Sequence, residues 1–303
     1  MDILGKGHRL ALIYNPRAGS AQAGLPARLL TRLGVQGATV LALPVRNPEQ
    51  MRAALDRCLA DRLDAVFGFG GDGTQRALAA RLCDSGIPLG PLPGGTFNYF
   101  VRNLGLPPTP LEALDAICAG APRSVSVGEV NGHLFLNNAS FGLYRSVIEE
   151  RERHKAKLGR SRAVALFSAL LTLLRAHPMY HVEVVAGERR HTIESPMLFF
   201  GCNALQLARL SPRLAQCAAK GELAVLALHR LRRADVVALG ARALTGTVDG
   251  AAQVEMLCAD SLEVMRAGHT VRCALDGEVR KLLLPLRVRL RKDALRVLAP
   301  ASS

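Results

Sequence analysis

The chain has 303 residues, of which 49% are hydrophobic and 21% are charged. This composition is typical of a folded globular protein, excludes long disordered tails, and fits two domains of ordinary size. The formal net charge of +14 favours an anionic partner, either nucleic acid or an anionic membrane surface. Aromatic residues make up only 4% of the chain and Trp is missing, which disfavours single-stranded nucleic acid because few stacking platforms are available.

The seven cysteines are scattered, their number is odd, and none forms a C-x-x-C pair. We therefore expect neither a disulfide framework nor a zinc site, and we expect the protein to reside in a reducing compartment. The segment Met1–Arg9 lacks the apolar core of a signal peptide. The longest apolar stretch with a helical pattern, Ala163–Leu174, falls short of the roughly 20 residues that span a bilayer. We therefore expect a cytoplasmic protein, soluble or peripherally associated with the inner face of the membrane.

The first part of the chain alternates strand and helix patterns. Strands are predicted at Leu10–Tyr14, Ala38–Leu43, Asp64–Phe67 and Pro88–Leu92, and helices from about Gln22, from Pro48, over Gln75–Leu82 and over Leu111–Ala119. This alternation predicts a parallel sheet with crossover helices. Three loops rich in glycine or proline follow three of these strands, and ligands of such sheets bind beyond the C-terminal ends of the strands.

After Pro122 the pattern changes to short alternating runs, which predict an antiparallel β domain. The runs are Ser124–Val130, His133–Asn138, His181–Val185, Met197–Cys202, Glu222–Leu228, Ser261–Met265 and Val271–Leu275. Near the C-terminus, Leu286, Val288 and Leu290 alternate with three arginines, which predicts a strand with one buried and one cationic face. Longer helical patterns cover Tyr144–Ala176 and Ala234–Thr245.

The loop Gly70-Gly71-Asp72-Gly73-Thr74 joins a buried strand pattern to a helical one. Glycines at such a junction let backbone N–H groups approach an anion at the N-terminus of the helix. Asp72 would repel a phosphate unless a divalent cation lay between them, so the loop points to metal-assisted phosphoryl chemistry.

A dinucleotide-binding dehydrogenase is the first alternative, because Gly68, Gly70 and Gly73 also satisfy G-x-G-x-x-G. That alternative requires an acid about 20 residues further on, and none occurs between Asp84 and Glu112. The chain also lacks G-x-x-x-x-G-K-[ST], which excludes the ordinary P-loop.

Four motifs occur in order along the chain: Asn15-Pro16-Arg17-Ala18-Gly19, Gly70-Gly71-Asp72-Gly73-Thr74, Pro93-Gly94-Gly95-Thr96-Phe97-Asn98 and Leu275-Asp276-Gly277-Glu278. Together they resemble the signatures of the diacylglycerol kinase catalytic family, which includes bacterial soluble lipid kinases and sphingosine kinases and is related to NAD kinases. The resemblance implies a Rossmann-like α/β domain of the NAD kinase type, residues 1–122 with 286–303. It also implies an antiparallel β-sandwich with inserted helices, residues 123–285, and a cleft where ATP meets a lipid hydroxyl.

The resemblance also implies site residues. The nucleotide would contact Asn15, Pro16, Arg17, Ala18 and Gly19, and its phosphates would contact Gly70, Gly71, Asp72, Gly73, Thr74, Gly94, Gly95, Thr96 and Asn98. Glu278 matches the proton acceptor, Asp276 lies beside it, and Asp72 would hold Mg²⁺ together with the nucleotide phosphates. Taken alone, Asp276-Gly277 is more simply a hairpin turn, and the ordered partner motifs reverse that preference.

Several residues depart from the family pattern. Arg76-Ala77 replaces Asn-Glu, and Tyr99 replaces an acid. Lys220, in Ala219-Lys220-Gly221-Glu222, replaces a carboxylate of the accessory metal loop, which predicts that this Mg²⁺ site is lost. A catalytically weak member that senses nucleotide or lipid is therefore an alternative to a lipid kinase, and a nucleic-acid-binding protein is a second one, based on charge alone.

A basic segment, Arg151–Arg162, carries six Lys or Arg and one acid and directly precedes the apolar stretch Ala163–Leu174. This arrangement suits docking on an anionic membrane. A solvated turn before a packed helix explains it equally well. The lipid substrate and the oligomeric state, with a dimer as one option, stay open.

Overall fold

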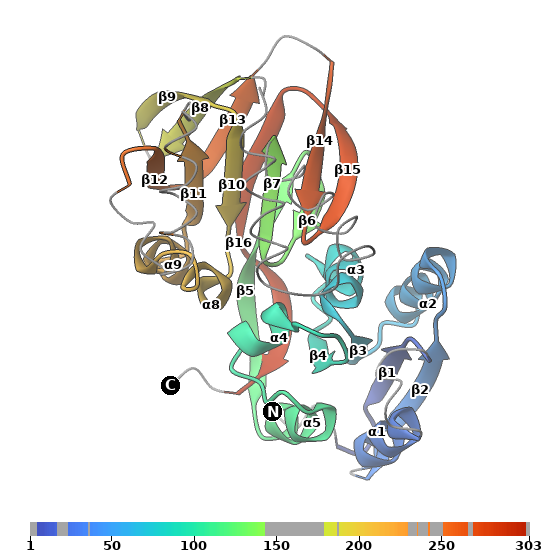
Figure 1. The fold of residues 1–303 in the computed structure, drawn as a ribbon. Coiled ribbons are helices and arrows are strands. Elements are labelled where there is room, and N and C mark those ends of the chain that lie inside the picture. Colours follow the sequence, from blue (N-terminus) through green and yellow to red (C-terminus); the bar gives the residue numbers. More distant parts are fainter. Residues whose placement is uncertain are drawn as a thin grey trace, which may run out of the picture. The chain divides into compact units, whose positions relative to one another are not determined.

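The computed structural model describes residues 5–16, 24–35, 37–142, 179–186, 188–229, 235, 242, 251–265 and 269–300. The chain divides into two compact units. Figure 1 shows the fold with colours that follow the residue number. Unit 1 comprises Met1–Val127 and Lys292–Ser303, and unit 2 comprises Gly128–Arg291. The boundaries thus follow Val127 and Arg291, whereas the family resemblance implied boundaries after residues 122 and 285.

Several predicted segments lie outside the described residues. They are Arg17–Gly19, the helical pattern Tyr144–Ala176 with the basic segment Arg151–Arg162, and Ala234–Thr245 apart from Asp235 and Arg242.

Unit 1 contains the predicted parallel sheet. Its strands are adjacent in the order β2 (Thr39–Pro44), β1 (Arg9–Tyr14), β3 (Ala65–Gly70) and β4 (Leu89–Pro93). The C-terminal part of β16 (Leu286–Ala299) continues this sheet, where Val297 lies opposite Leu89 in parallel. Every residue of β3 and β4 is buried, as expected of parallel strands covered on both faces.

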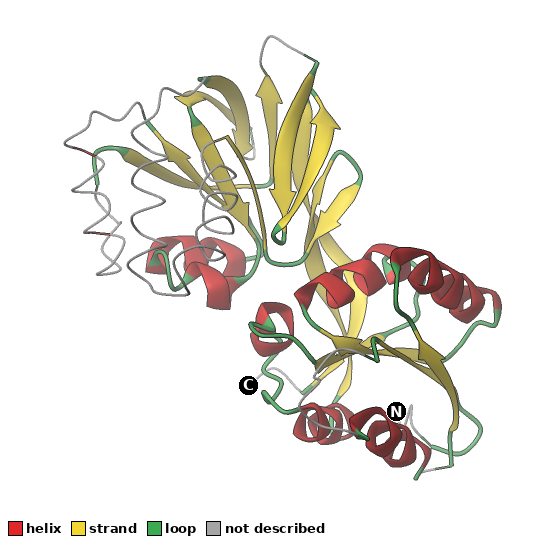
Figure 2. Ribbon diagram, turned by 45° about the vertical axis from the view of Figure 1, so that its right-hand side comes forward, coloured by secondary structure: helices red, strands yellow, loops and turns green. Residues whose placement is uncertain are grey.

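Helices cover both faces of this sheet, as Figure 2 shows. They are α1 (Leu25–Gly34), α2 (Pro48–Ala60), α3 (Asp72–Leu82), α4 (Tyr99–Asn103) and α5 (Pro110–Cys118). The start of α2 follows the usual rules, since Asn47 accepts a hydrogen bond from the Gln50 N–H at 2.8 Å and Pro48 occupies the first turn. Helix α3 begins at Asp72, three residues before the predicted start, so Asp72 lies in its first turn.

Unit 2 consists of two antiparallel sheets, as predicted. One sheet runs in the order β12 (Val254–Ala259), β11 (Leu223–Leu228), β10 (Met197–Gly201), β7 (Asn138–Gly142), β14 (Thr270–Leu275), β15 (Glu278–Leu283). The other is the antiparallel part of the 10-stranded sheet that also includes β1 to β4, and it contains β5 (Ala121–Val130), β6 (His133–Phe135), β16, β13 (Ser261–Met265), β8 (Tyr180–Ala186) and β9 (Arg189–Ser195).

Buried side chains of both sheets share one core, which makes unit 2 a β-sandwich. Phe141 and Phe200 of the first sheet and Val184 and Leu262 of the second belong to it. On the outer face of the first sheet, α8 (Ala204–Leu207) and α9 (Pro212–Ala219) cover a second apolar cluster.

The predicted alternation at the C-terminus is confirmed. Leu286 and Val288 of β16 are buried and Arg287 and Arg289 are exposed, whereas Leu290 and Arg291, which the prediction also included, are both half-buried. Among the described residues, no helix combines the length and the apolar character needed to cross a membrane.

The expectation that the chain lacks a disulfide is wrong. Cys217 of α9 and Cys258 of β12 form a disulfide, with their Cα atoms 5.3 Å apart. The two cysteines are separated by 41 residues and meet only because α9 packs on the outer face of the sheet. No local cysteine spacing could reveal such a pair.

Removing this disulfide by Cys217→Ser should lower the free energy of unfolding by about 4 kcal/mol, because the closed loop restricts the unfolded chain. Urea denaturation with and without reductant measures the change. The variant itself should respond no further to reductant, and a wild-type protein that is equally insensitive would contradict the prediction.

Candidate functional site

Three predicted loops meet at one edge of the unit 1 sheet. Asn15 follows β1, Gly71 follows β3 and Gly94 follows β4, and these three strands are adjacent and parallel. The C-terminal ends of parallel strands share one edge, so the loops lie where α/β sheets bind ligands.

The second and third loops contact each other through their backbones. The Gly94 N–H donates to the Gly70 carbonyl oxygen at 2.9 Å. A Cβ atom added to Gly94 would lie 2.9 Å from the Gly70 Cα, and one added to Gly95 would lie 2.6 Å from the Gly71 Cα. Side chains do not fit at such distances, so these glycines are required for the contact between the loops.

This contact decides which N–H groups are available to an anion. Gly94 donates to Gly70, and Gly95 donates to the Asn98 Oδ1 at 2.9 Å, so both donors are used within the loops. The first N–H groups of a helix have no acceptor inside the helix, and in α3 these belong to Asp72, Gly73 and Thr74. The first turn of α3 is therefore the place where a phosphate fits best.

Asn98 shapes the third loop. Its side chain accepts from the Gly95 N–H and donates to the Gly95 carbonyl oxygen, both at 2.9 Å, while its own φ is +49°. Asparagine tolerates this left-handed conformation better than most residues. Asn98 thus holds Gly95 in place, and Thr96 is exposed beside it.

The carboxylate of Asp72 lies at the N-terminus of α3, where the helix dipole favours negative charge. Its Oδ1 accepts the N–H of Phe100 in α4 at 3.1 Å. Arg76 follows one turn later on α3 and is buried, so a cation occupies the position where the family pattern has asparagine.

Gln75 is a site residue that sequence reasoning missed. It is fully buried, and its Nε2 donates to the carbonyl oxygens of Gly68 at 2.8 Å and Leu92 at 3.1 Å. Gln75 therefore ties the ends of β3 and β4 together directly beneath the glycine loops. A polar residue on the apolar face of a helical pattern was the only available signal.

A pocket of 470 Å³ in unit 1 borders the third loop. Its lining includes Gly94, Gly95 and Asn98 with Leu25, Arg28, Phe69, Pro93 and Pro108–Leu111. The volume lies within the usual range for small-molecule sites, and apolar walls with one cation and few polar groups are typical of them.

In unit 2, Asp276 and Gly277 form the two-residue turn between β14 and β15. Their φ angles are +48° and +89°, as a type I′ hairpin requires. The Asp276 carboxylate accepts three backbone N–H groups, from Leu136 at 2.7 Å, Asn137 at 2.8 Å and Asn138 at 3.1 Å. Asp276 therefore fixes the turn to the segment between β6 and β7.

Glu278 has a different environment. It is the first residue of β15, its side chain is 52% exposed, and its Oε2 lies 3.7 Å from an Arg280 nitrogen. An exposed carboxylate on a fixed turn can reach a ligand, whereas the Asp276 carboxylate is already occupied by backbone donors.

Behind Asp276 lies a polar network that the sequence did not reveal. Asn203 donates to the Asn137 side chain at 2.6 Å, and Asn138 donates to the Gln206 side chain at 2.8 Å. Burial, and secondly the Asp276 charge, raise the pKa of the neighbouring Cys202 thiol to about 12. That thiol stays protonated and is not a nucleophile at neutral pH.

The segment aligned with the accessory metal loop is a helix cap. The N–H of Gly221 donates to the Ala218 carbonyl and that of Glu222 to the Cys217 carbonyl, with Gly221 at φ +73°, which is a Schellman motif after α9. Lys220 at this C-terminus is favourable to the helix dipole. Across the described residues, no group of three or more His, Cys, Asp or Glu is placed to hold a metal.

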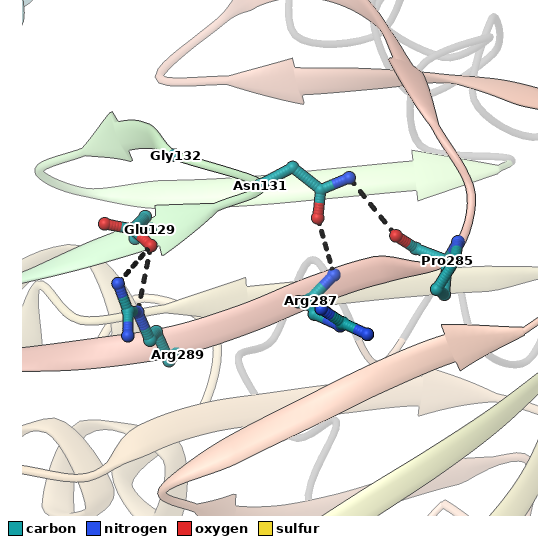
Figure 3. Close-up of a pocket in the computed structure, with 6 residues that line it drawn as sticks. All are labelled: Glu129, Asn131, Gly132, Pro285, Arg287 and Arg289. Carbon is teal, nitrogen blue, oxygen red and sulfur yellow. Dashed lines mark hydrogen bonds and ion pairs between the residues drawn. The ribbon is translucent and has the colours of Figure 1, made fainter.

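A pocket of 520 Å³ in unit 2 is shown in Figure 3. Asn131 donates to the carbonyl oxygens of Leu283 at 2.8 Å and Pro285 at 3.2 Å and accepts the Arg287 N–H at 2.7 Å. Arg289 donates to the Glu129 carboxylate at 2.9 Å. The polar groups of this pocket thus bind one another and fasten the β15–β16 connection.

The geometry of unit 1 agrees with comparisons to known proteins. Residues 9–130 match the model of the diacylglycerol kinase catalytic domain. A diacylglycerol kinase of Staphylococcus aureus strain RF122 is 30% identical over 146 residues, which are 47% of this chain and 46% of that protein. The chain therefore matches about half the length of such curated relatives.

Two crystal structures from Bacillus anthracis Sterne share the fold. One has a TM-score of 0.73 at 20% identity and covers 97% of this chain and 96% of the other. The second, described as a diacylglycerol kinase, has a TM-score of 0.68 at 19% identity, with 97% and 98% covered. Residues 9–130 are thus similar to the diacylglycerol kinase catalytic domain, and the chain shares the fold of these structures.

Proposed function

We propose that the protein is an ATP-dependent lipid kinase that transfers the γ-phosphoryl group to a hydroxyl of diacylglycerol or a related membrane lipid. The observation that carries the proposal is the backbone contact between the loops after β3 and β4, which leaves the first turn of α3 open to a phosphate. The names of the relatives give the substrate class. We further propose a cytoplasmic protein that associates peripherally with the membrane.

In this proposal unit 1 binds the nucleotide. The N–H groups of Gly73 and Thr74 donate hydrogen bonds to phosphate oxygens, and Asn98 holds the Gly95 backbone in place. Asp72 fits Mg²⁺, because this ion is commonly held by one or two carboxylates together with substrate phosphates. Mg²⁺ bound there supplies charge neutralisation on the phosphates. Asn15 and Pro16 are proposed nucleotide contacts at the end of β1.

Glu278 is the proposed proton acceptor for the lipid hydroxyl. A carboxylate at the start of β15 is exposed enough to accept that proton, and the hydrogen bonds of Asp276 hold its turn rigid. Asp276 is thereby a positioning residue in this mechanism, with its carboxylate engaged by the backbone.

A nucleotide or lipid sensor with weak or no catalysis is the second candidate. Ala77 and Tyr99 stand at positions where the family pattern has acids, and Lys220 closes a helix. Tyr99 also stacks on Phe97, with ring centroids 5.6 Å apart. Nucleotide binding without phosphoryl transfer to a lipid would favour the sensor.

Incubation with radiolabelled ATP, Mg²⁺ and a total bacterial lipid extract should give a labelled lipid. Glu278→Gln should lower the rate by about 10²- to 10⁴-fold, the usual contribution of a general base, and leave nucleotide affinity unchanged. Glu194→Gln, an equally exposed glutamate on β9, is the control. If the wild-type protein binds nucleotide but forms no labelled lipid, the kinase proposal is rejected and the sensor remains.

Asp276→Ala should lower the free energy of unfolding by about 3 kcal/mol, because three backbone N–H groups lose a charged acceptor. Glu278→Gln should change it by less than about 0.5 kcal/mol, since that side chain is exposed. Chemical denaturation measures both. Equal stability of the two variants would contradict the positioning role of Asp276.

Gly95→Ala should weaken nucleotide binding at least about tenfold, because its methyl group separates the two loops and displaces their donors. Gly34→Ala at the end of α1 is the matched control, since a Cβ there meets nothing within 4 Å. Titration with a fluorescent ATP analogue, with circular dichroism to verify folding, tests the pair. Unchanged affinity in a folded Gly95→Ala would refute the loop assignment.

A further inference from the structure

The edge strand β15 exposes apolar side chains on its outer face. Within β15, Leu282 belongs to the buried core. Because side chains alternate along a strand, Val279, Lys281 and Leu283 point to the opposite face, away from the core. Val279 is 39% exposed and Leu283 is 67% exposed. Strand β15 ends the sheet order, so no described strand lies beyond it.

Two cations lie on this face. Arg272 of β14 is directly opposite Lys281 and lies between two buried residues, Val271 and Cys273. Like charges directly opposite one another destabilise a sheet. In the described part of the chain, neither side chain takes part in an ion pair that would relieve the repulsion. The Arg272–Lys281 pair therefore lowers the stability of the sheet, and no ion pair among the described residues offsets its repulsion.

The exposed leucine is held firmly in place. The Leu283 carbonyl accepts the Asn131 side chain at 2.8 Å, and the next residue, Leu284, donates its N–H to the His269 carbonyl at 3.1 Å. Figure 3 shows Asn131 reaching toward this connection at Pro285. Leu283 is thus presented to solvent by fixed backbone and is not part of a frayed strand end.

A second copy of the chain is a poor occupant for this surface. Arg280 and Lys281 are consecutive residues of the edge strand, and cations on an edge strand oppose pairing with another edge. An anionic lipid surface accepts both features, because its phosphates attract the cations and its acyl boundary takes up the apolar side chains.

We propose that Arg272, Val279, Lys281 and Leu283, the β14–β15 face, form a docking surface for an anionic lipid bilayer. The inference rests on the proposed function, since Glu278 begins the strand that carries this face. Glu278 lies at the opposite end of β15 from Leu283, and the six residues of this strand span about 17 Å.

The test is co-sedimentation with vesicles of phosphatidylglycerol and phosphatidylcholine, and with vesicles of phosphatidylcholine alone, both without nucleotide. Wild-type protein should bind the anionic vesicles. Leu283→Glu should bind them at least about tenfold more weakly, because an exposed apolar side chain that would enter the acyl boundary becomes a negative charge that anionic lipid repels. Val35→Glu in unit 1, whose side chain is 68% exposed, is the matched control and should bind like wild type.

Lys281→Glu separates docking from a structural role. It places an acid opposite Arg272, so the melting temperature should stay equal or rise, while vesicle binding should fall about tenfold. Arg52→Glu on α2 is the charge-matched control. Unchanged vesicle binding in folded Leu283→Glu and Lys281→Glu would overturn the inference, as would variants that shift a dimer equilibrium without affecting vesicles.

Binding and transfer are measured separately, so the two proposals can fail independently. Vesicle binding that depends on the β14–β15 face, with no labelled lipid formed, would reject the kinase and keep the docking surface. Labelled lipid formed equally well by both face variants would keep the kinase and reject the docking surface.

Discussion

The close backbone contact between two glycine loops is the constraint on which the candidate site depends. Gly70 and Gly71 can approach Gly94 and Gly95 only because none of them carries a side chain. Their hydrogen bonding uses the Gly94 and Gly95 donors, so the proposed phosphate contacts fall on the first turn of α3. Gln75 supports the same arrangement from below by bonding to the backbone of both strands.

In unit 2 a side chain, and not a contact between glycines, holds the candidate site residues in place. Asp276 and Glu278 are two residues apart but have different surroundings: the first carboxylate accepts backbone N–H groups, and the second is exposed to solvent. Asp276 receives three N–H groups and is fixed, while Glu278 is left half exposed on the rigid turn. The Asp-Gly pair therefore forms the hairpin turn that its composition favours and holds the position of the proposed proton acceptor.

Sequence reasoning found what is encoded locally. The continuous apolar runs of β3 and β4, the Pro and Asn at the start of α2, and the alternation of β16 all have local patterns. It missed β15, whose polar side chains conceal an edge strand, and the Cys217–Cys258 pair, which depends on the packing of α9. Gln75 and Asn137 were missed for a related reason, because only tertiary structure shows which carbonyl or amide a buried polar group meets.

The division of the chain has a consequence for its synthesis. Unit 1 is built from both ends of the chain, since the last part of β16 lies beside β4 through Val297 and Leu89. Unit 2 is one continuous segment, Gly128–Arg291. On the ribosome, domains tend to fold as their residues emerge, so the second unit has all its residues before the first unit receives its final strand. The parallel sheet of unit 1 is thus the last part of the molecule to be completed.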